Sequence, residues 1–560
     1  MDDKSPRHGL KLLVIGLDGA TWDVIKPMVA RGKLPNLARL MKIGGHGDLQ
    51  STMPPFSPPA WATFMTGVNP GKHGIFGFVN FNPQSYSQIE SGFVTASPLV
   101  GHTTFDILSY SKFRLGVISV PITYPAWPIN GYMVSGEPCP DNQKYMVYPE
   151  SFANNLTRQY AFPSAFWSRP NDEIINGLYE MDHSRTELAI QLILEDNLDA
   201  LFVVLGATDR VQHNFWRFYE KRFGSQLGLP HDRKYESVIP ETYRRADKAI
   251  GRILSHVDHN TLVFVISDHG GGPAATKYFH TNAWLLEMGY LQIMQGRDSL
   301  VEHSRGAALA LRRILDTSVG SRLRSLLPAQ IIRQGRMLVR NIAQIDWLET
   351  RAYRFPMYPP VEGIVINLAG RQPQGIVQPG GEYEQLREEI IDQMLQFVDL
   401  ETGEHVVEQA YTREQLFHGA YIERAPDIIL VLKEDFTGGT GIQPPLVSNV
   451  NPATLNKVNG EHRMQGILLA YGPMIKNNHT IEGARLVDMA PTLLYSLGLP
   501  VAKVMDGVVL KDLFVPEFLT ANPETKASIR DKAEFDIPEA SLTLEEEKQI
   551  EEQLRRLGYL

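Results

Sequence analysis

The chain has 560 residues, of which 43% are hydrophobic and 21% are charged, a balance typical of a globular protein with a large core. Its formal net charge of −9 lacks the basic surplus with which nucleic-acid-binding proteins neutralise phosphates, so no nucleic-acid partner is expected. The single cysteine, Cys139, excludes a disulfide within the chain. The N-terminal segment has no signal-peptide layout, and no apolar run approaches the roughly 18 residues of a membrane helix. A cytoplasmic protein without a membrane segment is therefore expected.

Short apolar runs that alternate with helical patterns predict an α/β fold. In chain order, the runs are 12–17, 115–120, 201–205, 262–266, 363–368, 428–432 and 467–470. Most of them are continuous rather than alternating, which suits strands that are covered on both faces. Together with the helices between them, they predict a doubly wound, largely parallel sheet.

Helix signals lie between these runs. Thr21 and Pro35 are residue types that favour helix starts, and each precedes or opens an amphipathic stretch. Residues 185–195 and 243–257 carry apolar side chains three and four positions apart, as a helix with one buried face requires.

One large domain is expected over residues 9–515. Within it, a basic, helix-rich stretch at about 298–341 lies between two predicted strands. We interpret this stretch as a helical insertion that covers or borders the functional site. A solvated pair of amphipathic helices without a role in the site is an equal alternative.

The remaining residues, 516–560, predict a C-terminal extension. Its first part, up to about 538, has the composition of a linker. Its last part has an acidic start and a basic end, which favour a helix. We expect this helix to dock on the core through Leu544, Ile550 and Leu554.

Four separate segments place Asp or His next to an apolar strand. They are LLVIGLDGA with Asp18, LFVVLGATDRVQH with Asp209 and His213, LVFVISDHGGGP with Asp268 and His269, and NGEHRMQGILLAYGP with His462. Because ligands of an open α/β sheet collect at the carboxyl ends of its strands, we expect the first three segments to converge. Asp and His offer the oxygen and nitrogen ligands that zinc or manganese accepts, and six exceed the needs of one tetrahedral ion. The combination predicts a two-metal site, although each segment alone is more often a cap or a surface turn.

Ser57 lies among four prolines in the segment STMPPFSPPAWATFMTG. A helix that starts near Pro59 would place Ser57 at its N-terminus, where free amides and the helix dipole favour an incoming phosphate. A serine hydroxyl becomes a good nucleophile when a metal ion activates it. Local sequence alone favours the alternative, in which Ser57 merely caps the helix. His73, in the turn PGKHGIFG, is expected to be structural.

These motifs, taken in order, resemble those of a known family. LDG, S-x-P followed by TG-x-x-P-x-x-HG, D-x-x-x-H, SDHG and G-x-H are similar to the motifs of the alkaline phosphatase superfamily, most closely its type I phosphodiesterase and nucleotide pyrophosphatase branch. The resemblance spans about residues 12–510. It implies an alkaline-phosphatase-like fold with two zinc ions, or manganese as the alternative. The implied ligands are Asp18, Ser57, Asp268 and His269 for one ion, and Asp209, His213 and His462 for the other.

The same resemblance implies that Ser57 attacks phosphorus and forms a phosphoseryl intermediate that is then hydrolysed. The predicted substrate is a small phosphate ester or nucleotide with a phosphodiester or pyrophosphate bond. A phosphomonoesterase or phosphomutase is the alternative; the absence of an arginine close to Ser57 in the sequence favours diesters, because monoesterases of the superfamily use one. A sulfatase would need arginine where Trp61 stands. The complete set of site residues disfavours a non-catalytic metal-binding protein.

Two features depart from the family pattern. The family generally has threonine as its nucleophile, and it has an asparagine twenty-one positions later, where this chain has Phe78. Asn80 and Asn82 lie close by, and either is a candidate substitute for binding a phosphate oxygen; Asn80 is the residue that we assign. Lys277 and His280 follow the SDHG segment and are further candidates for substrate contact.

Overall fold

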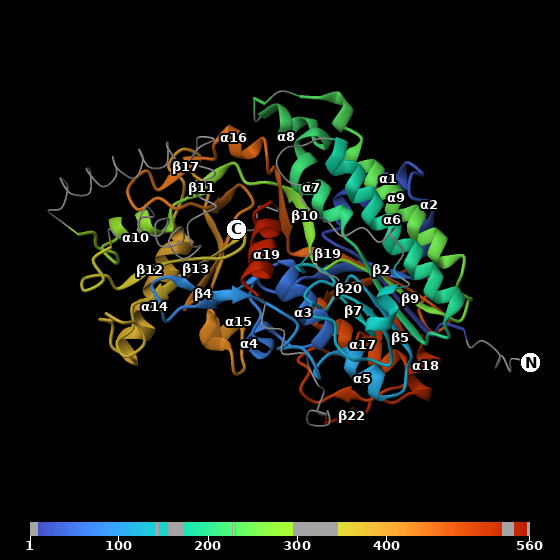
Figure 1. The fold of residues 1–560 in the computed structure, drawn as a ribbon. Coiled ribbons are helices and arrows are strands. Elements are labelled where there is room, and N and C mark those ends of the chain that lie inside the picture. The colour runs from blue at the N-terminus through green and yellow to red at the C-terminus, as the bar shows by residue number, and fades with distance from the viewer. Residues whose placement is uncertain are drawn as a thin grey trace, which may run out of the picture.

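The computed structural model describes residues 9–140, 145–154, 156, 172–226, 228–229, 231–294, 345–528 and 543–556. The predicted insertion at 298–341 lies outside the described residues. The largest element of the fold is a nine-stranded sheet (Figure 1).

The nine strands form one sheet in which most neighbours are parallel. Their order is β20 (His479–Arg485), β2 (Gly45–Gln50), β19 (Gln465–Tyr471), β9 (Leu262–Ile266), β1 (Leu12–Leu17), β8 (Ala200–Leu205), β5 (Leu115–Ile118), β6 (Gly131–Val134) and β7 (Val147–Tyr148). Only β19 and β7 run antiparallel to their neighbours in this sheet. The predicted doubly wound, largely parallel sheet is thereby confirmed.

Helices cover both faces of this sheet (Figure 1). One layer contains α1 (Trp22–Ala30), α2 (Pro35–Ile43), α6 (Asp172–Glu195), α7 (Ala207–Tyr219) and α9 (Val238–Leu254); the other contains α3 (Ser57–Thr66), α5 (Thr104–Tyr110), α17 (Met489–Ser496) and α19 (Leu544–Arg556). In β1, Leu13, Ile15 and Leu17 pack in the first layer, whereas Leu12 and Val14 pack in the second. Because side chains of a strand alternate between faces, a strand buried on both sides must be continuously apolar.

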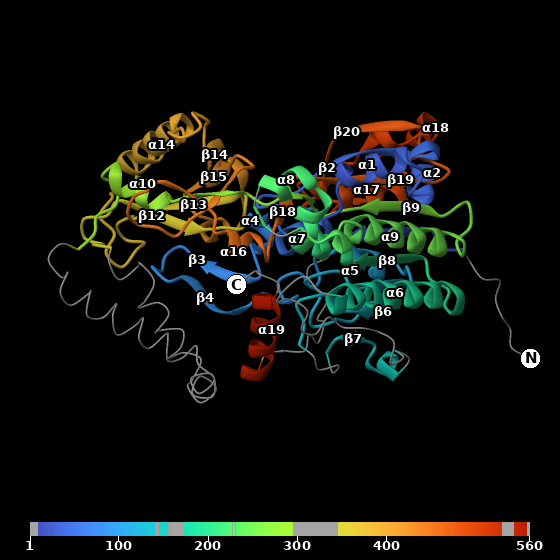
Figure 2. The ribbon, with the colours of Figure 1, turned by 90° about the horizontal axis from the view of Figure 1, so that it is seen from above.

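A second sheet forms a separate part of the molecule, seen at the left of Figures 1 and 2. Its strands are β12 (Ala352–Pro356), β13 (Val361–Ile366), β15 (Ile428–Leu432) and β14 (Val407–Thr412), and all neighbours are antiparallel. The assignment of runs 363–368 and 428–432 to the parallel sheet was therefore wrong. Every residue of β13 and β15 is buried, and a continuously buried strand has the same apolar pattern in either type of sheet.

The C-terminal extension contains the predicted docking helix. In α19, Ile550 and Leu554 are buried in the layer that also contains α3, which confirms two of the three expected contacts. The side chain of Leu544 lies outside the described residues. The expected linker begins with a helix, α18 (Pro516–Ala521), and a short strand, β22 (Lys526–Ala527), which pairs with β21 (Val501–Ala502).

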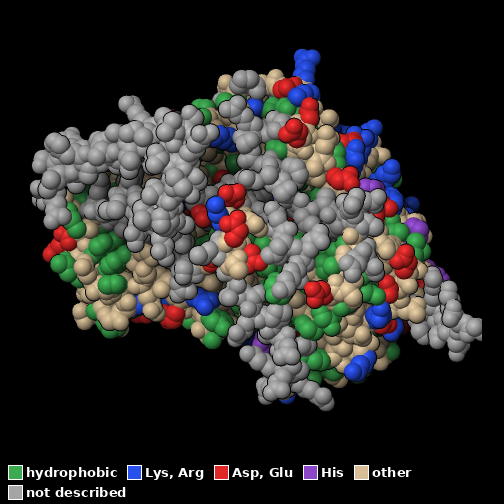
Figure 3. Space-filling view, in the orientation of Figure 1, with side chains coloured by type: hydrophobic (Ala, Val, Ile, Leu, Met, Phe, Trp, Pro, Cys, Tyr) green, Lys and Arg blue, Asp and Glu red, His purple; other side chains and the backbone are tan. Residues whose placement is uncertain are grey.

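The described surface carries mixed charges. In Figure 3, acidic side chains gather near the centre of the view, where α19 lies in Figure 1; the first turn of α19 contains Glu545, Glu546 and Glu547. Among the described residues, none of the helices has both the length and the apolar composition needed to cross a membrane. The cytoplasmic location stays a prediction.

Gly16 of β1 marks a close contact between the sheet and α3. A Cβ atom at this position would lie 2.5 Å from the ring of Trp61 and 2.9 Å from Val204. We expect Gly16→Ala to destabilise the fold by about 1–3 kcal/mol through overpacking, measured as a lower unfolding temperature. Gly381→Ala is the control, because a Cβ there meets no atom within 4 Å. Equal stability of the two variants would contradict the contact.

Candidate active site

Three neighbouring strands deliver the predicted aspartates to one edge of the sheet. Asp18 directly follows β1, Asp268 follows β9 by one residue, and Asp209 lies in the first turn of α7 after β8. β1 pairs in parallel with both β8 and β9, with Leu17 opposite Leu205 and Gly16 opposite Ile266. The predicted convergence is therefore present in the structure.

The first cluster surrounds the hydroxyl of Ser57. Its Oγ donates to Asp18 Oδ1 at 3.5 Å and lies 3.2 Å from His269 Nε2. The same imidazole nitrogen lies 3.3 Å from Asp268 Oδ2 and 3.8 Å from Asp18 Oδ1. All four side chains are buried, so the hydroxyl is surrounded by two carboxylates and one imidazole with little water.

The second cluster adjoins the first. Asp209 Oδ1 lies 3.3 Å from Nε2 of both His213 and His462, and these two nitrogens are 3.1 Å apart. His213 lies one helical turn after Asp209 on α7, so both face the same side. The rings of His462 and His269 stack with their centroids 3.6 Å apart, which places the two clusters side by side.

His462 reaches the site through a two-stranded ribbon. It belongs to β18 (Gly460–Arg463), which pairs antiparallel with β10 (Gly270–Pro273), and His462 lies opposite Gly271. Because β10 begins directly after His269, this pairing joins the two clusters. His462 was expected next to an apolar strand, but the sequence gives no signal for the pairing of its own segment with β10.

The backbone fixes which nitrogen each imidazole presents to the site. In each of the three histidines, Nδ1 lies 2.9 Å from a main-chain carbonyl oxygen: Gly460 O for His213, Pro55 O for His462 and Gly270 O for His269. A carbonyl can only accept, so Nδ1 donates. The neutral ring therefore presents the Nε2 lone pair to the clusters, as metal-ligating histidines commonly do.

Electrostatic repulsion dominates the carboxylates. Burial, followed by the charges of Asp268 and Asp209, raises the pKa of Asp18 well above its ordinary value. Burial also raises the pKa of Asp268 to about 7. For Asp209, burial acts in the same direction, but His213 and His462 outweigh it and hold its pKa well below the ordinary value. Positive charge is thus required to keep all three aspartates ionised.

The donor set fits divalent cations. Asp209 Oδ1 and the Nε2 atoms of His213 and His462 are three acceptors that face one another, and a cation satisfies all of them at once. Asp18, Asp268 and His269 form the other group with ligand atoms within 4.8 Å of one another. In addition, the buried Oδ2 of Asp268 accepts no hydrogen bond from the described residues. Mixed carboxylate and imidazole ligands are suited to zinc or manganese.

Helix α3 holds Ser57 as expected, but it offers few amides. Ser57 is the first residue of α3, and the next two, Pro58 and Pro59, carry no N–H group. The expectation that several free amides bind phosphate here was therefore wrong; the helix dipole and the amide of Ser57 remain. Trp61, one turn further, donates from Nε1 to Asp18 Oδ2 at 3.4 Å.

The predicted substrate residues make other contacts. Lys277 pairs with Asp399 and Glu401 of the second sheet's loops. His280 lies 2.8 Å from Ser448 Oγ and accepts the Gly441 amide at Nδ1. Both sets of contacts are structural, and the role of these residues in substrate binding stays a prediction.

The position twenty-one residues after Ser57 lies beside the site. Phe78 lines the same pocket as Ser57, and its ring packs edge-on against Phe56 with centroids 5.0 Å apart. Asn80 lies on β3 (Val79–Asn82) and is half-buried, and its predicted contact with a phosphate oxygen stays a prediction.

The structure adds residues that the sequence analysis missed. Arg185 of α6 and Arg210 of α7 line the pocket that contains Ser57 and Asp18, together with Glu137. The argument for diesters from a missing arginine therefore fails. Arg210 directly follows Asp209, which was a usable signal, whereas Arg185 approaches from a remote helix.

Tyr358 is a second addition, and it comes from the loop before β13. Its hydroxyl lies 3.4 Å from His462 Nε2, and its ring stacks on Phe56 with centroids 3.9 Å apart. The second sheet thus contributes to the site. The sequence around Tyr358 gave no indication that this residue contacts His462.

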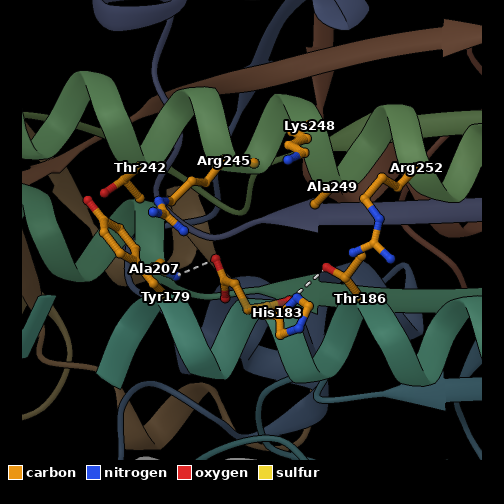
Figure 4. Close-up of a pocket in the computed structure, with 11 residues that line it drawn as sticks. Tyr179, His183, Thr186, Ala207, Thr242, Arg245, Lys248, Ala249 and Arg252 are labelled. Carbon is orange, nitrogen blue, oxygen red and sulfur yellow. Dashed lines mark hydrogen bonds between the residues drawn. The ribbon is translucent and has the colours of Figure 1, made fainter. Parts of the chain in front are cut away.

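A groove between α6 and α9 extends to Ala207 at the start of α7 (Figure 4). Its volume is about 230 Å³, and Tyr179 and His183 on α6 face Arg245 and Arg252 on α9. Asp182 of α6 accepts the amides of Gly206 and Ala207 at 3.0 and 3.3 Å. These two hydrogen bonds cap the start of α7, the helix that carries Asp209.

Comparison with known proteins gives the family. Residues 12–465 match the sequence profile of the family described as type I phosphodiesterase / nucleotide pyrophosphatase. The chain belongs to this family. It is accordingly a hydrolase that acts on phosphate esters. No curated protein sequence matches the chain.

Several solved structures with low sequence identity to this chain align with it over most of their length. Murine ectonucleotide pyrophosphatase/phosphodiesterase 5, an inactive variant in complex with AMP, is 15% identical, with a TM-score of 0.48 over 90% of this chain and 100% of that chain. The human enzyme of the same name is 14% identical, with a TM-score of 0.45 over 90% and 99%. Phosphonoacetate hydrolase from Sinorhizobium meliloti 1021, in complex with phosphonoformate, is 14% identical, with a TM-score of 0.49 over 87% and 95%.

His73 links the helix of Ser57 to the following turn. Its Nε2 lies 3.1 Å from Thr63 Oγ1, and its Nδ1 accepts the Ile75 amide, which agrees with the predicted structural role. Burial lowers the pKa of His73 to about 3. The folded state therefore binds fewer protons than the unfolded state, and stability falls as the pH drops below about 6.5.

We expect this histidine to reduce the free energy of unfolding by about 2 kcal/mol between pH 7.5 and pH 5. His73→Gln removes the titrating group, so the variant should lose less stability than the parent over this interval. Urea unfolding at both pH values measures the difference. Parallel losses in the two proteins would show that His73 does not cause the acid sensitivity.

Proposed function

We propose that this chain hydrolyses phosphodiester or nucleotide pyrophosphate bonds, with Ser57 as the nucleophile. One observation carries the proposal: the Ser57 hydroxyl lies in a buried pocket, 3.5 Å from Asp18 Oδ1 and 3.2 Å from His269 Nε2, beside a second cluster of Asp and His. The reaction class follows from the family to which the chain belongs, type I phosphodiesterase / nucleotide pyrophosphatase.

Two divalent cations, zinc in our proposal, fit the two clusters. Asp18, Ser57, Asp268 and His269 would hold one ion, and Asp209, His213 and His462 would hold the other. When bound, such ions lower the pKa of a nearby hydroxyl and stabilise the negative charge of a phosphoryl group. Nδ1-to-carbonyl hydrogen bonds hold the three imidazoles in the orientation that this role requires.

The proposed reaction has two steps: transfer of the phosphoryl group to Ser57, and hydrolysis of the resulting phosphoseryl bond. The Ser57 oxygen forms a bond to phosphorus while the ester oxygen departs, and the serine proton leaves along the hydrogen bond towards Asp18. Water then cleaves the phosphoseryl bond and restores the hydroxyl. The buried walls around Ser57, including Phe78 and Val204, limit the water that competes with substrate.

A phosphomonoesterase is the second candidate, and Arg185 and Arg210 are the observation that favours it. Both line the pocket of Ser57, where a guanidinium can bind the extra charge of a monoester. Family membership favours the diesterase. A sulfatase is disfavoured, since Trp61 occupies the position of the required arginine and donates to Asp18 instead.

Removing the nucleophile should abolish turnover. We expect Ser57→Ala to lower kcat for bis-p-nitrophenyl phosphate by at least about 1,000-fold, because the variant lacks the oxygen that attacks phosphorus. Ser57→Thr is the matched control and should keep substantial activity, since it preserves the hydroxyl. Steady-state kinetics measure both variants, and an Ala variant as fast as the parent would rule out Ser57 as nucleophile.

Metal content provides a separate test of the two clusters. Asp209→Asn and Asp268→Asn should each reduce bound zinc by about one ion per chain, because each removes a charged ligand from a different cluster. Elemental analysis after dialysis measures the metal, and EDTA should abolish activity that zinc then restores. Asp232→Asn is the control, because Asp232 is exposed and belongs to neither cluster. Full metal content in both ligand variants would contradict the assignment.

A further inference from the structure

The site of Ser57 has few groups that can bind the oxygens of a phosphate. Pro58 and Pro59 remove two amides from the start of α3, and Phe78 stands at the position where the family has an asparagine. Bound cations would neutralise charge on the phosphoryl group that Ser57 attacks, so a further negative charge of the substrate needs binding groups from another part of the pocket. Arginine is suited to this task because its planar guanidinium matches two oxygens of an anion.

Two arginines meet beside Ser57, at the point where β8 turns into α7. A Cβ atom on Gly206 would lie 3.2 Å from Arg185 Nη1 and 3.8 Å from Arg210 Nε, so both guanidinium groups approach the same stretch of backbone. The absence of a side chain at Gly206 permits this approach. Arg185 also donates to Val204 O at 3.2 Å, which anchors it at the end of β8.

Glu137 is the carboxylate that the pocket places against this pair. It forms an ion pair with Arg185 at 3.5 Å and another with Arg210. Asp182 lies near Arg185 outside the pocket, and its two oxygens accept the amides that begin α7. Glu137 is thus shared by two guanidinium groups, whereas the other carboxylates that line the pocket, Asp18 and Asp209, belong to the clusters proposed to hold cations.

Ser119 lines the same pocket and has an unusual backbone. Its φ is +56°, in the left-handed region that a serine rarely adopts, and it directly follows β5. Such conformations cost about 1–3 kcal/mol and occur preferentially at functional sites. Ser119 thus lies on the same wall of the pocket as the two arginines.

We propose that Arg185 and Arg210 form an anion subsite that binds a second negative charge of the substrate, next to the phosphorus that Ser57 attacks. The subsite rests on the proposed function and narrows the substrate class to phosphate esters with an additional anionic group. That charge comes either from a second ionised oxygen on the same phosphorus or from a neighbouring phosphate. Glu137 is the internal counter-ion with which the bound anion competes for the two guanidinium groups.

The direct test is the binding of inorganic pyrophosphate to the zinc-loaded full chain, measured by isothermal titration calorimetry. We expect Arg210→Gln and Arg185→Gln to weaken binding by about 10- to 100-fold, as the loss of a charge-assisted hydrogen bond implies. Arg210→Lys should fall between the parent and Arg210→Gln. Arg245→Gln is the matched control, because Arg245 lies on α9 and pairs with Glu241 outside the pocket.

Glu137→Gln gives an effect of opposite sign. It removes the carboxylate that competes with the ligand, so pyrophosphate should bind more tightly to this variant than to the parent. A purely structural role of the three residues predicts a loss of binding in every variant. Weaker binding in Glu137→Gln, or unchanged binding in both arginine variants with an unchanged unfolding temperature, would overturn the subsite.

Kinetics distinguish the two sources of the second charge. The substrates are bis-p-nitrophenyl phosphate, with one charge, p-nitrophenyl phosphate, with a second charge on the same phosphorus, and ADP, with a neighbouring phosphate. Arg210→Gln should lower kcat/KM for one of the last two by at least tenfold more than for the first. Equal losses on all three would contradict the subsite. If the unmutated protein cleaves none of the three substrates, the proposed hydrolysis is wrong. The pyrophosphate titration then still tests the subsite, because it measures binding and not turnover.

Discussion

The structure depends on the cost of burying several carboxylates at one edge of a sheet. Asp18, Asp209 and Asp268 are placed there by three adjacent parallel strands, and the sheet geometry leaves them little freedom to move apart. Like charges in a site with little water repel strongly, so the surrounding groups must supply compensation. The imidazoles of His213 and His462 turn their Nε2 atoms towards Asp209, and Asp18 and Asp268 keep raised pKa values. A site in which carboxylates and imidazole nitrogens face one another suits cations.

The two sheets contribute differently to this arrangement. The parallel sheet fixes the carboxylates, because its strand ends are held by hydrogen bonds on both sides. The ribbon of β10 and β18 brings His462 across, and the loop before β13 adds Tyr358. The three aspartates thus lie at the ends of the parallel strands, whereas His462 and Tyr358 come from a two-stranded ribbon and a loop. Such a division is common in α/β enzymes, where a stable frame supports variable loops.

Sequence reasoning located the groups that follow directly from strand topology. Asp18, Asp209 and Asp268 each follow a continuous apolar run, and parallel strands bring their ends together whatever the rest of the chain does. Tyr358 and Arg185 could not be found in this way, because their approach depends on how distant elements pack. The prolines after Ser57 correctly indicated the start of a helix. The same prolines carry no N–H group, so they remove amides that the N-terminus of the helix would otherwise offer to a phosphate. For the second sheet, burial on both faces hides strand direction, since apolar runs look alike in parallel and antiparallel pairing.

The hydrogen bonds that orient the three imidazoles end on main-chain oxygens of Pro55, Gly270 and Gly460. Every residue type has a carbonyl group, so exchange of a side chain at these positions does not remove the acceptor. The acceptors therefore depend on the path of the backbone and not on side-chain chemistry. That path itself restricts two of the positions, because a Cβ atom on Gly270 would lie 2.1 Å from Gln465 O and one on Gly460 would lie 2.2 Å from Gln212 O. Replacing either glycine would shift the backbone that holds the imidazole in its tautomer.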